Sequence, residues 1–232
     1  MKGLKNRFLL FPLPAILAPE KRSFFDLPAD QYKDAEMRSR RFSQFRFMWN
    51  GKDWQVTKLP HTVFVQAREH NQLVGGIARE FSPLKIDPAK FVKTTANAAN
   101  LSRKSIWHAS VHQIRVKAEK DKQSQVVPEG LHRDGFEFAA LLAVARENIT
   151  GGVTTLVREP GQEPVYEGII PAMSGLIFDD QAFYHYTSSI SAQAGVGYRD
   201  MFIIVFKQWH RRQYGDEFER SAVTSEMPYR IQ

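Results

Sequence analysis

The chain has 232 residues, of which 43% are hydrophobic and 12% aromatic, so it can bury a substantial core, and we expect one domain. It contains no cysteine, which excludes a disulfide framework, a cysteine-based zinc site, an iron–sulfur cluster and a cysteine nucleophile. The formal charge of +7 favours anionic partners, but the basic residues are interspersed with acidic ones.

The N-terminal segment, residues 8–18, is apolar and follows Lys2, Lys5 and Arg7, which is the outline of a signal peptide. Two prolines interrupt this segment, and it is too short to span a bilayer. We therefore expect a buried, extended N-terminal arm, a cytoplasmic location and no membrane span.

Helix formers dominate residues 27–41, where Pro28 suits a first helical turn, so a helix is predicted there. The densest basic cluster of the chain, Arg38-Ser39-Arg40-Arg41, lies at its end, and a solvated surface explains it at least as well as nucleic-acid binding does. A β-hairpin is predicted over residues 45–57, because two apolar runs flank Asn50-Gly51, a dipeptide that favours a type I′ turn.

The middle of the chain combines a turn with a helix. Gly75-Gly76 indicates a turn or a close backbone approach, and we interpret the nearby Arg79 as structural. Asp87-Pro88 predicts the start of a helix, with Asp as the N-cap and Pro at the first helical position, and this helix extends to about Leu101.

The second half of the chain reads as short strands separated by turns, and we expect the metal-binding candidates on its connections. Such spacing is typical of a sandwich or barrel, and a jelly roll of the cupin kind brings ligands from different strands to one open end. We expect a single α+β, mainly β, domain over residues 1–232, with an N-terminal arm, hairpin and helices (1–104) packed on a jelly-roll core with the metal site (105–210), and a C-terminal tail (211–232). The predicted strands are 107–116, 138–144, 153–157, 166–170, 175–178 and 201–206.

The candidate metal ligands are His132, Asp134 and His185. Side chains two apart on an extended segment point the same way, so His132 and Asp134 can bind one ion, and His185 is the best third ligand. Two histidines and one carboxylate suit non-haem Fe(II) chemistry. Chance also explains a single His-x-Asp, and a loop histidine is more often solvated or hydrogen-bonded.

His112 and Gln113 lie on a predicted strand whose alternation sends one of them inward. Either could orient a ligand, or both could be ordinary sheet residues. A fourth protein ligand, for instance His112, would favour a closed binding site over catalysis.

Three segments resemble the 2-oxoglutarate and Fe(II)-dependent dioxygenases of the bacterial isoleucine 4-hydroxylase type: residues 131–137, residues 146–152, and the distal His185 with Arg199. Further similar segments are residues 27–32, 40–43 and 71–81. The resemblance implies a double-stranded β-helix in which His132, Asp134 and His185 ligate Fe(II), with 2-oxoglutarate and O₂ as co-substrates.

The resemblance also implies a cation for the far carboxylate of 2-oxoglutarate, and Arg199 has the expected place after the distal histidine. A guanidinium offers a carboxylate two parallel hydrogen bonds. A surface salt bridge to Asp200 is the alternative. The spacing from His185 is a few residues longer than the shortest in the superfamily, so Arg115 is the substitute, and Gln113 is a further cofactor-binding candidate.

The resemblance suggests a free aliphatic L-amino acid as substrate, with hydroxylation or, for methionine, sulfoxidation. Its two charged groups need an Arg and an acid near the iron. The candidates are Arg133, Glu137 and Arg158, although surface ion pairs explain each of them equally well.

Two other classes of protein remain open. A basic dioxygenase could act on nucleic acid, but it would need a clustered basic groove and a base-stacking aromatic residue. A cupin-like metal-binding module would hold the same three residues without catalysis. We also consider a homodimer, because several aromatic residues could form an interface.

Overall fold

The computed structural model describes residue 4, residues 6–71, residue 73, residues 75–120 and residues 122–212. Seven antiparallel strands form a main sheet in the order β1-β9-β5-β12-β4-β2-β3. The strands of this sheet are β1 (Phe8–Pro12), β2 (Arg38–Trp49), β3 (Trp54–Lys58), β4 (Trp107–Glu119), β5 (Phe138–Glu147), β9 (Ser174–Asp179) and β12 (Val196–Gln208).

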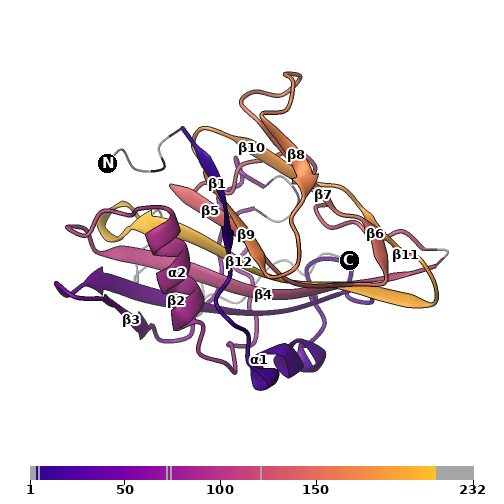
Figure 1. Ribbon diagram of the computed structural model, residues 1–232, viewed down its shortest axis with the longest axis horizontal. Helices are drawn as coiled ribbons and strands as arrows, with labels where there is room; N and C mark the ends of the chain where they lie inside the picture. Colours follow the sequence, from indigo (N-terminus) through magenta and orange to yellow (C-terminus); the bar gives the residue numbers. More distant parts are fainter. Residues whose placement is uncertain (1–3, 5, 72, 74, 121, 213–232) are drawn as a thin grey trace.

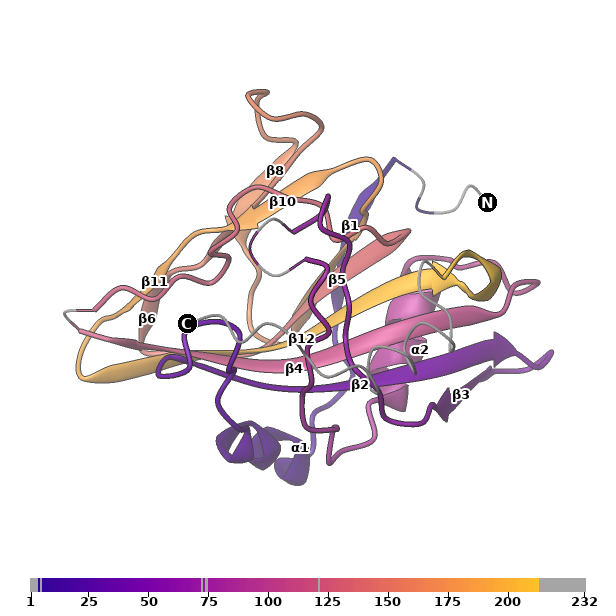
Figure 2. The ribbon, with the colours of Figure 1, turned by 180° about the vertical axis from the view of Figure 1, so that it is seen from behind.

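Two smaller antiparallel sheets lie across from the main sheet (Figures 1 and 2). One has the order β10-β7-β8 and the other pairs β11 with β6. Their strands are β6 (Ile149–Gly151), β7 (Val153–Val157), β8 (Tyr166–Ile169), β10 (Tyr184–Thr187) and β11 (Ile190–Ala192). The expected mainly β, jelly-roll fold is confirmed.

The helices lie outside this double layer. They are α1 (Ala18–Arg22), α2 (Ala89–Ala98) and two short 3₁₀ segments, η1 (Ser23–Asp26) and η2 (Trp209–Arg211). Figure 1 shows α2 against one face of the main sheet, and α1 below the sheet. In the part of the chain that the structure describes, no helix has the length and apolar character needed to cross a membrane.

Strand alternation gives the main sheet two different faces. On the outer face, Val111 of β4 and Phe202 of β12 pack in an apolar cluster with Phe91 of α2. On the inner face, Ile114 of β4 and Met201 of β12 line a pocket under the smaller sheets. Because successive side chains of a strand point to opposite faces, residue parity decides which side chains can reach this pocket.

Local sequence explains α2 and the hairpin. The Asp87 carboxylate accepts the Ala89 N–H at 2.9 Å, and the buried side chains of α2 recur at helical spacing. In the β2–β3 turn, the Asn50 side chain accepts the N–H groups of Lys52 and Asp53, and Gly51 has φ +98°. The predicted hairpin and second helix are present. The turn is not of type I′, because four residues connect Trp49 and Trp54 and Asn50 has no positive φ. The N-cap of α2 is Pro88 rather than Asp87.

The predicted helix over residues 27–41 is wrong. Its last residues begin β2, whose Arg38 pairs with Val116 of β4, and residues 27–37 form turns and an isolated bridge. Pairing with the long strand β4 outweighs the helix propensity of this segment. Arg38, Arg40 and Arg41 are at most 9% exposed, so the interpretation of this cluster as a solvated surface is also wrong.

All six predicted strands of the second half are present, and β6, β10 and β11 are additional. The N-terminal arm is extended as expected, because β1 pairs with β9, but Leu9 and Leu10 are exposed, so the arm is only partly buried. The predicted tail lies, from residue 213 onwards, outside the described residues.

The packing of α2 on the sheet predicts that Phe91→Ala destabilises the protein by about 3–5 kcal/mol, the usual cost of removing a buried phenyl ring. Phe91 is fully buried, and its ring centroid lies 4.8 Å from that of Phe202. Urea unfolding measures the effect. Met48→Ala is the matched control, since Met48 is 40% exposed, and we expect it to cost less than about 0.5 kcal/mol. Equal effects would contradict this packing.

Candidate functional site

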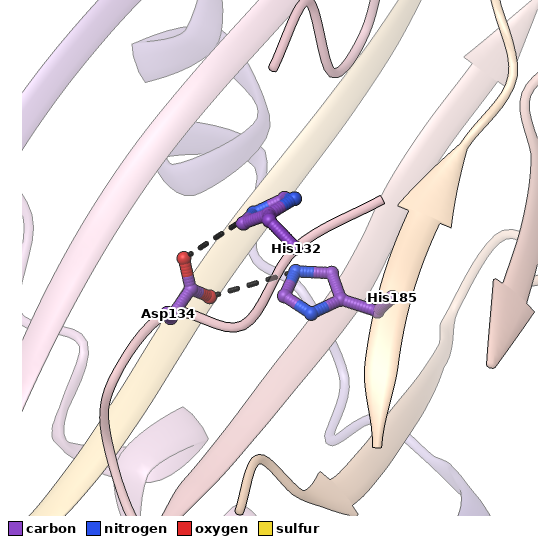
Figure 3. A group of neighbouring side chains, drawn as sticks. All are labelled: His132, Asp134 and His185. Atoms are coloured by element: carbon purple, nitrogen blue, oxygen red, sulfur yellow. Dashed lines mark ion pairs between the residues drawn. The ribbon is translucent and has the colours of Figure 1, made fainter. Parts of the chain in front are cut away.

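The side chains of His132, Asp134 and His185 point toward one another, as Figure 3 shows. All three line the pocket. His132 Nε2 lies 3.5 Å from Asp134 Oδ1, and His185 Nε2 lies 3.6 Å from Asp134 Oδ2. One ligand atom from each residue lies within 4.8 Å of the other two. Two imidazoles and a carboxylate at this spacing fit a divalent metal and leave coordination positions free.

Backbone pairing holds the two imidazoles together. The N–H of His132 donates to the carbonyl of His185 at 3.0 Å, and the N–H of His185 donates to the carbonyl of His132 at 2.8 Å. The ring centroids are 4.2 Å apart. His132 thus extends the small sheet beside β10, and His185 lies on that strand rather than on a connection as we expected.

The Asp180 carboxylate fixes the loop that carries Asp134. It accepts the backbone N–H groups of Asp134, Gly135 and Phe136 at 3.0, 2.8 and 2.9 Å. Gly135 has φ +85° and lies against the His70 ring, so a side chain would not fit there. Burial and the charge of Asp134 raise the pKa of Asp180 to about 7, and the three N–H groups oppose this rise.

In the metal-free protein, one of the two candidate histidine ligands is protonated at neutral pH and the other is neutral. Burial opposes the charged form of His132, but the hydrogen bond to Asp134 and its charge raise the pKa of His132 to about 9. Burial, followed by the positive charge of His132, lowers the pKa of His185 to about 4. Because a metal binds neutral imidazole, its binding displaces the proton on His132.

Arg199 lies on the inner face and lines the same pocket. It is 4% exposed, and its Nε and Nη2 have no hydrogen-bond partner among the described residues. Burial, with repulsion from Arg146 and Arg38, lowers the pKa of Arg199 to about 9, so it stays charged at neutral pH. A buried, unpaired guanidinium fits the carboxylate of a bound acid.

Arg115 and Gln113 do not reach this pocket, because their positions on β4 belong to the outer face. Arg115 donates from Nε and Nη2 to the two carboxylate oxygens of Asp200, both at 2.7 Å. Gln113 Nε2 donates to Ser23 Oγ at 2.7 Å. Asp200 is therefore the partner of Arg115 and not of Arg199.

The three substrate-binding candidates also lie outside the pocket lining. Arg133 lies over the Tyr184 ring and donates to the carbonyl of Arg158 at 3.4 Å. Glu137 accepts the N–H of Gln208 at 3.1 Å. Arg158 is exposed and packs over Phe183. Closeness to the ligands in sequence did not translate into closeness at the pocket.

The charged wall of the pocket comes from residues that we had interpreted otherwise. Arg38 and Arg40 point inward from β2, and Arg79, which we took as structural, lines the pocket from the segment between β3 and α2. The signal in the sequence was the alternation Arg38, Arg40, Phe42 beside β4. Further lining residues not assigned to the site are Lys33, Gln66, Asn71 and Glu129.

His112 lines the pocket but is not among the grouped ligands of the described chain. Its Nδ1 lies 2.6 Å from Arg40 Nη2, and its ring stacks on Phe42. Burial, then the charge of Arg40, lowers its pKa well below 6.5, so His112 is neutral and accepts from Arg40. It therefore orients a pocket arginine.

Comparisons with known proteins identify the family. The model of the 2OG-Fe dioxygenase family matches residues 21–205. L-isoleucine-4-hydroxylase from Bacillus thuringiensis is 23% identical over 203 residues, which are 83% of each chain.

Solved structures show the same fold. A BsmA homologue from Methylobium petroleophilum PM1 has a TM-score of 0.68 at 23% identity, covering 82% of this chain and 79% of its own. IDO from Bacillus thuringiensis has a TM-score of 0.64 at 18% identity, covering 87% of this chain and 93% of its own.

The ligand geometry predicts that Mn(II) or Co(II), used in place of Fe(II), stabilises the metal-free protein. An ion that binds only the folded state at about 100 times its Kd should raise the unfolding temperature by roughly 5–10 °C. His132→Ala should abolish this shift, whereas His61→Ala, at an exposed position away from the cluster, should retain it. Thermal unfolding with and without metal measures both. An undiminished shift in His132→Ala would remove it from the site.

The three N–H groups at Asp180 predict that Asp180→Asn weakens Mn(II) binding about 10- to 100-fold, because an amide has one acceptor oxygen and turns an NH₂ group toward a backbone donor. Titration calorimetry measures the Kd. Asp179→Asn is the control, since Asp179 bonds to the backbone of Asn6 and Gln181 instead. An unchanged Kd in Asp180→Asn would show that the loop does not depend on this carboxylate.

Proposed function

Because the chain belongs to the 2OG-Fe dioxygenase family, which uses Fe(II), 2-oxoglutarate and O₂, we propose that it oxidises a free aliphatic L-amino acid. The reaction is hydroxylation of a C–H bond or, for methionine, oxidation of the sulfur. The supporting observation is the pocket itself, which is lined both by the three candidate metal ligands and by Arg199, an arginine without an anionic partner in the described part of the chain. L-isoleucine-4-hydroxylase, with 23% identity, supports the substrate class.

Fe(II) bound at this cluster would couple decarboxylation of 2-oxoglutarate to oxidation of the substrate, with substrate, 2-oxoglutarate and O₂ giving hydroxylated product, succinate and CO₂. His132, Asp134 and His185 would hold the ion. Arg199 would bind the far carboxylate of 2-oxoglutarate through Nε and Nη2, which have no partner among the described residues.

The remaining residues would orient the ligands and exclude water. Asp180 and Gln66 hold Asp134, Gln66 by donating from Nε2 to Asp134 Oδ1 at 3.1 Å. The inner face of the main sheet provides an apolar wall for an aliphatic side chain. Its residues are Ile114, Val116, Leu141, Met201, Ile203 and Val205.

We further propose that residues 1–232 belong to a single dioxygenase domain. The main sheet combines β1, β2 and β3 with strands from beyond residue 105, and the pocket takes residues from both parts. The homodimer and the cytoplasmic location stay predictions from the sequence.

The two competing classes have less support. A nucleic-acid substrate would need accessible basic side chains, whereas Arg38, Arg40 and Arg79 are at most 6% exposed. A closed metal site would need a fourth ligand, and within the described residues the cluster has three. Both classes are outcomes of the following assay.

The test is succinate formation by the Fe(II)-loaded protein with 2-oxoglutarate and air, measured against free L-amino acids and single-stranded oligonucleotides. We expect one or more aliphatic amino acids to stimulate turnover, His132→Ala to abolish it, and Arg199→Gln to raise the KM for 2-oxoglutarate about 10- to 100-fold, because a charge-assisted pair is lost. Arg158→Gln, at an exposed site, should behave as wild type.

Stimulation by oligonucleotides alone would move the function to nucleic acid. Absence of both succinate and an Fe(II)–2-oxoglutarate absorption band would contradict an open iron site. An unchanged KM in Arg199→Gln would place the 2-oxoglutarate carboxylate elsewhere.

A further inference from the structure

The charged wall of the pocket contains four cations, of which Arg38, Arg40 and Arg79 are buried and Lys33 is largely covered. Two carboxylates lie among them, Glu129 in the pocket lining and the fully buried Asp30 behind it. Lys33 Nζ lies 2.8 Å from both oxygens of Glu129. Asp30 Oδ2 lies 3.2 Å from Arg38 Nε and 3.8 Å from Arg40 Nη1. Both carboxylates are therefore engaged, and three of the four cations have an anionic partner.

The fourth cation, Arg79, has no carboxylate within ion-pair distance among the described residues. It is 1% exposed, and its Nε has no hydrogen-bond partner there. Its Nη2 donates to Gln66 Oε1 at 3.3 Å, and its guanidinium lies 4.7 Å from the centroid of the Phe64 ring. Burial lowers the pKa of Arg79 to about 10, so it is charged at neutral pH.

The pocket thus contains two buried arginines without an anion, Arg79 and Arg199. Leaving a charge buried and unpaired is costly, and a carboxylate from a ligand removes that cost. Arg199, on the main sheet, is taken by 2-oxoglutarate in the function proposed above. A second anion is needed at Arg79.

We propose that Arg79 binds the free carboxylate of the organic substrate. This assignment rests on the proposed function in giving Arg199 to 2-oxoglutarate. It deepens that function because it names the recognised group: a free acid is accepted, whereas an amide or a residue within a peptide, whose carboxylate is blocked, is not.

The position of Arg79 suits this role. Gln66 accepts from Arg79 through Oε1 and donates from Nε2 to Asp134 Oδ1, so one amide side chain separates the guanidinium from a metal ligand. A small acid bound to Arg79 through its carboxylate would thus have its carbon chain beside the candidate metal ligands. Phe64 fixes the arginine by stacking, since it packs against both Arg79 and Arg40.

Arg40 is a weaker candidate for the same role. Its Nη2 and Nε lie 2.6 and 3.2 Å from His112 Nδ1, and it shares Asp30 with Arg38. Its donors are thus occupied, whereas the Nε–H of Arg79 has no partner among the described residues and can donate to an acid.

The experiment compares acids with their amides by thermal unfolding, anaerobically, with Mn(II) and 2-oxoglutarate present. The probes are L-isoleucine, L-leucine and L-methionine and the three corresponding primary amides. We expect at least one acid, and none of the amides, to raise the unfolding temperature of the wild type. Arg79→Gln should weaken binding of that acid about 10- to 100-fold, and Arg79→Lys, which keeps the charge without the bidentate edge, should weaken it less.

The 2-oxoglutarate Kd, taken from the Fe(II)–2-oxoglutarate absorption band, separates the two arginines. This Kd should be unchanged in Arg79→Gln and strongly raised in Arg199→Gln. Arg158→Gln is the matched control for both ligands. Far-UV circular dichroism and the unfolding temperature without ligand check that each variant is folded. If Arg79→Gln does not fold, the comparison is made with Arg79→Lys.

The outcomes are distinct. Equal binding of acid by wild type and Arg79 variants, equal binding of acid and amide, or binding of no probe would overturn the assignment. Loss of 2-oxoglutarate binding in Arg79→Gln would exchange the roles of the two arginines and overturn it as well. Acid binding that depends on Arg79 without succinate formation would support the carboxylate site while contradicting the proposed amino-acid oxidation.

Discussion

Strand alternation in β4 and β12 is the constraint on which the rest of the structure depends. These strands pair over their full lengths, with Val196 opposite Glu119 and Gln208 opposite Trp107, so one register decides the facing of every side chain between them. The outer side is apolar where it packs against α2, and the inner side carries the pocket. A shift of one residue would turn Arg199 toward the helix and Arg115 toward the pocket.

The same register explains why two similar arginines have different environments. Arg115 and Asp200 are opposite each other on the outer face, so their charges cancel in a bidentate pair. Arg199, one position away from Asp200, faces inward and is left without an acid. Pairing on one face and an unpaired charge on the other follow from a single alternation. A sequence motif that counts only spacing from the distal histidine does not contain this information.

Much of the fold could be predicted because its signals are local. The alternation of β4, the Asn50-Gly51 turn and the start of α2 just after Asp87 each depend on a few neighbouring residues. Strands β6 and β11 have three residues each, too few for a period to show. The first residues of β2 were predicted as helix because local sequence does not reveal their extended conformation. That conformation comes from pairing with β4, about 75 residues further along the chain.

The candidate site divides in the same way. The spacing of His132 and Asp134 is local, and His185 was the best third ligand even before the resemblance implied it, so the three residues that the structure brings together could be named beforehand. Arg38, Arg40 and Arg79 could not, because their burial depends on partners distant in sequence. Asp30 neutralises Arg38 eight positions away, but Arg40 also needs His112, 72 positions away, as an acceptor. Without these partners, a run of arginines reads as surface.

The charge balance of the pocket links stability to ligand binding. Each carboxylate of the charged wall already neutralises a neighbouring cation, so Arg79 and Arg199 raise the free energy of the ligand-free fold. A divalent ion bound by His132, Asp134 and His185 adds to the positive charge of the pocket, because it replaces the single proton on His132. A bound anion is therefore stabilised by two interactions, a direct contact with a guanidinium and the attraction of the metal ion. A pocket with this balance selects acids over neutral molecules before any contact with the substrate's side chain, and the apolar inner face can then discriminate between acids by shape.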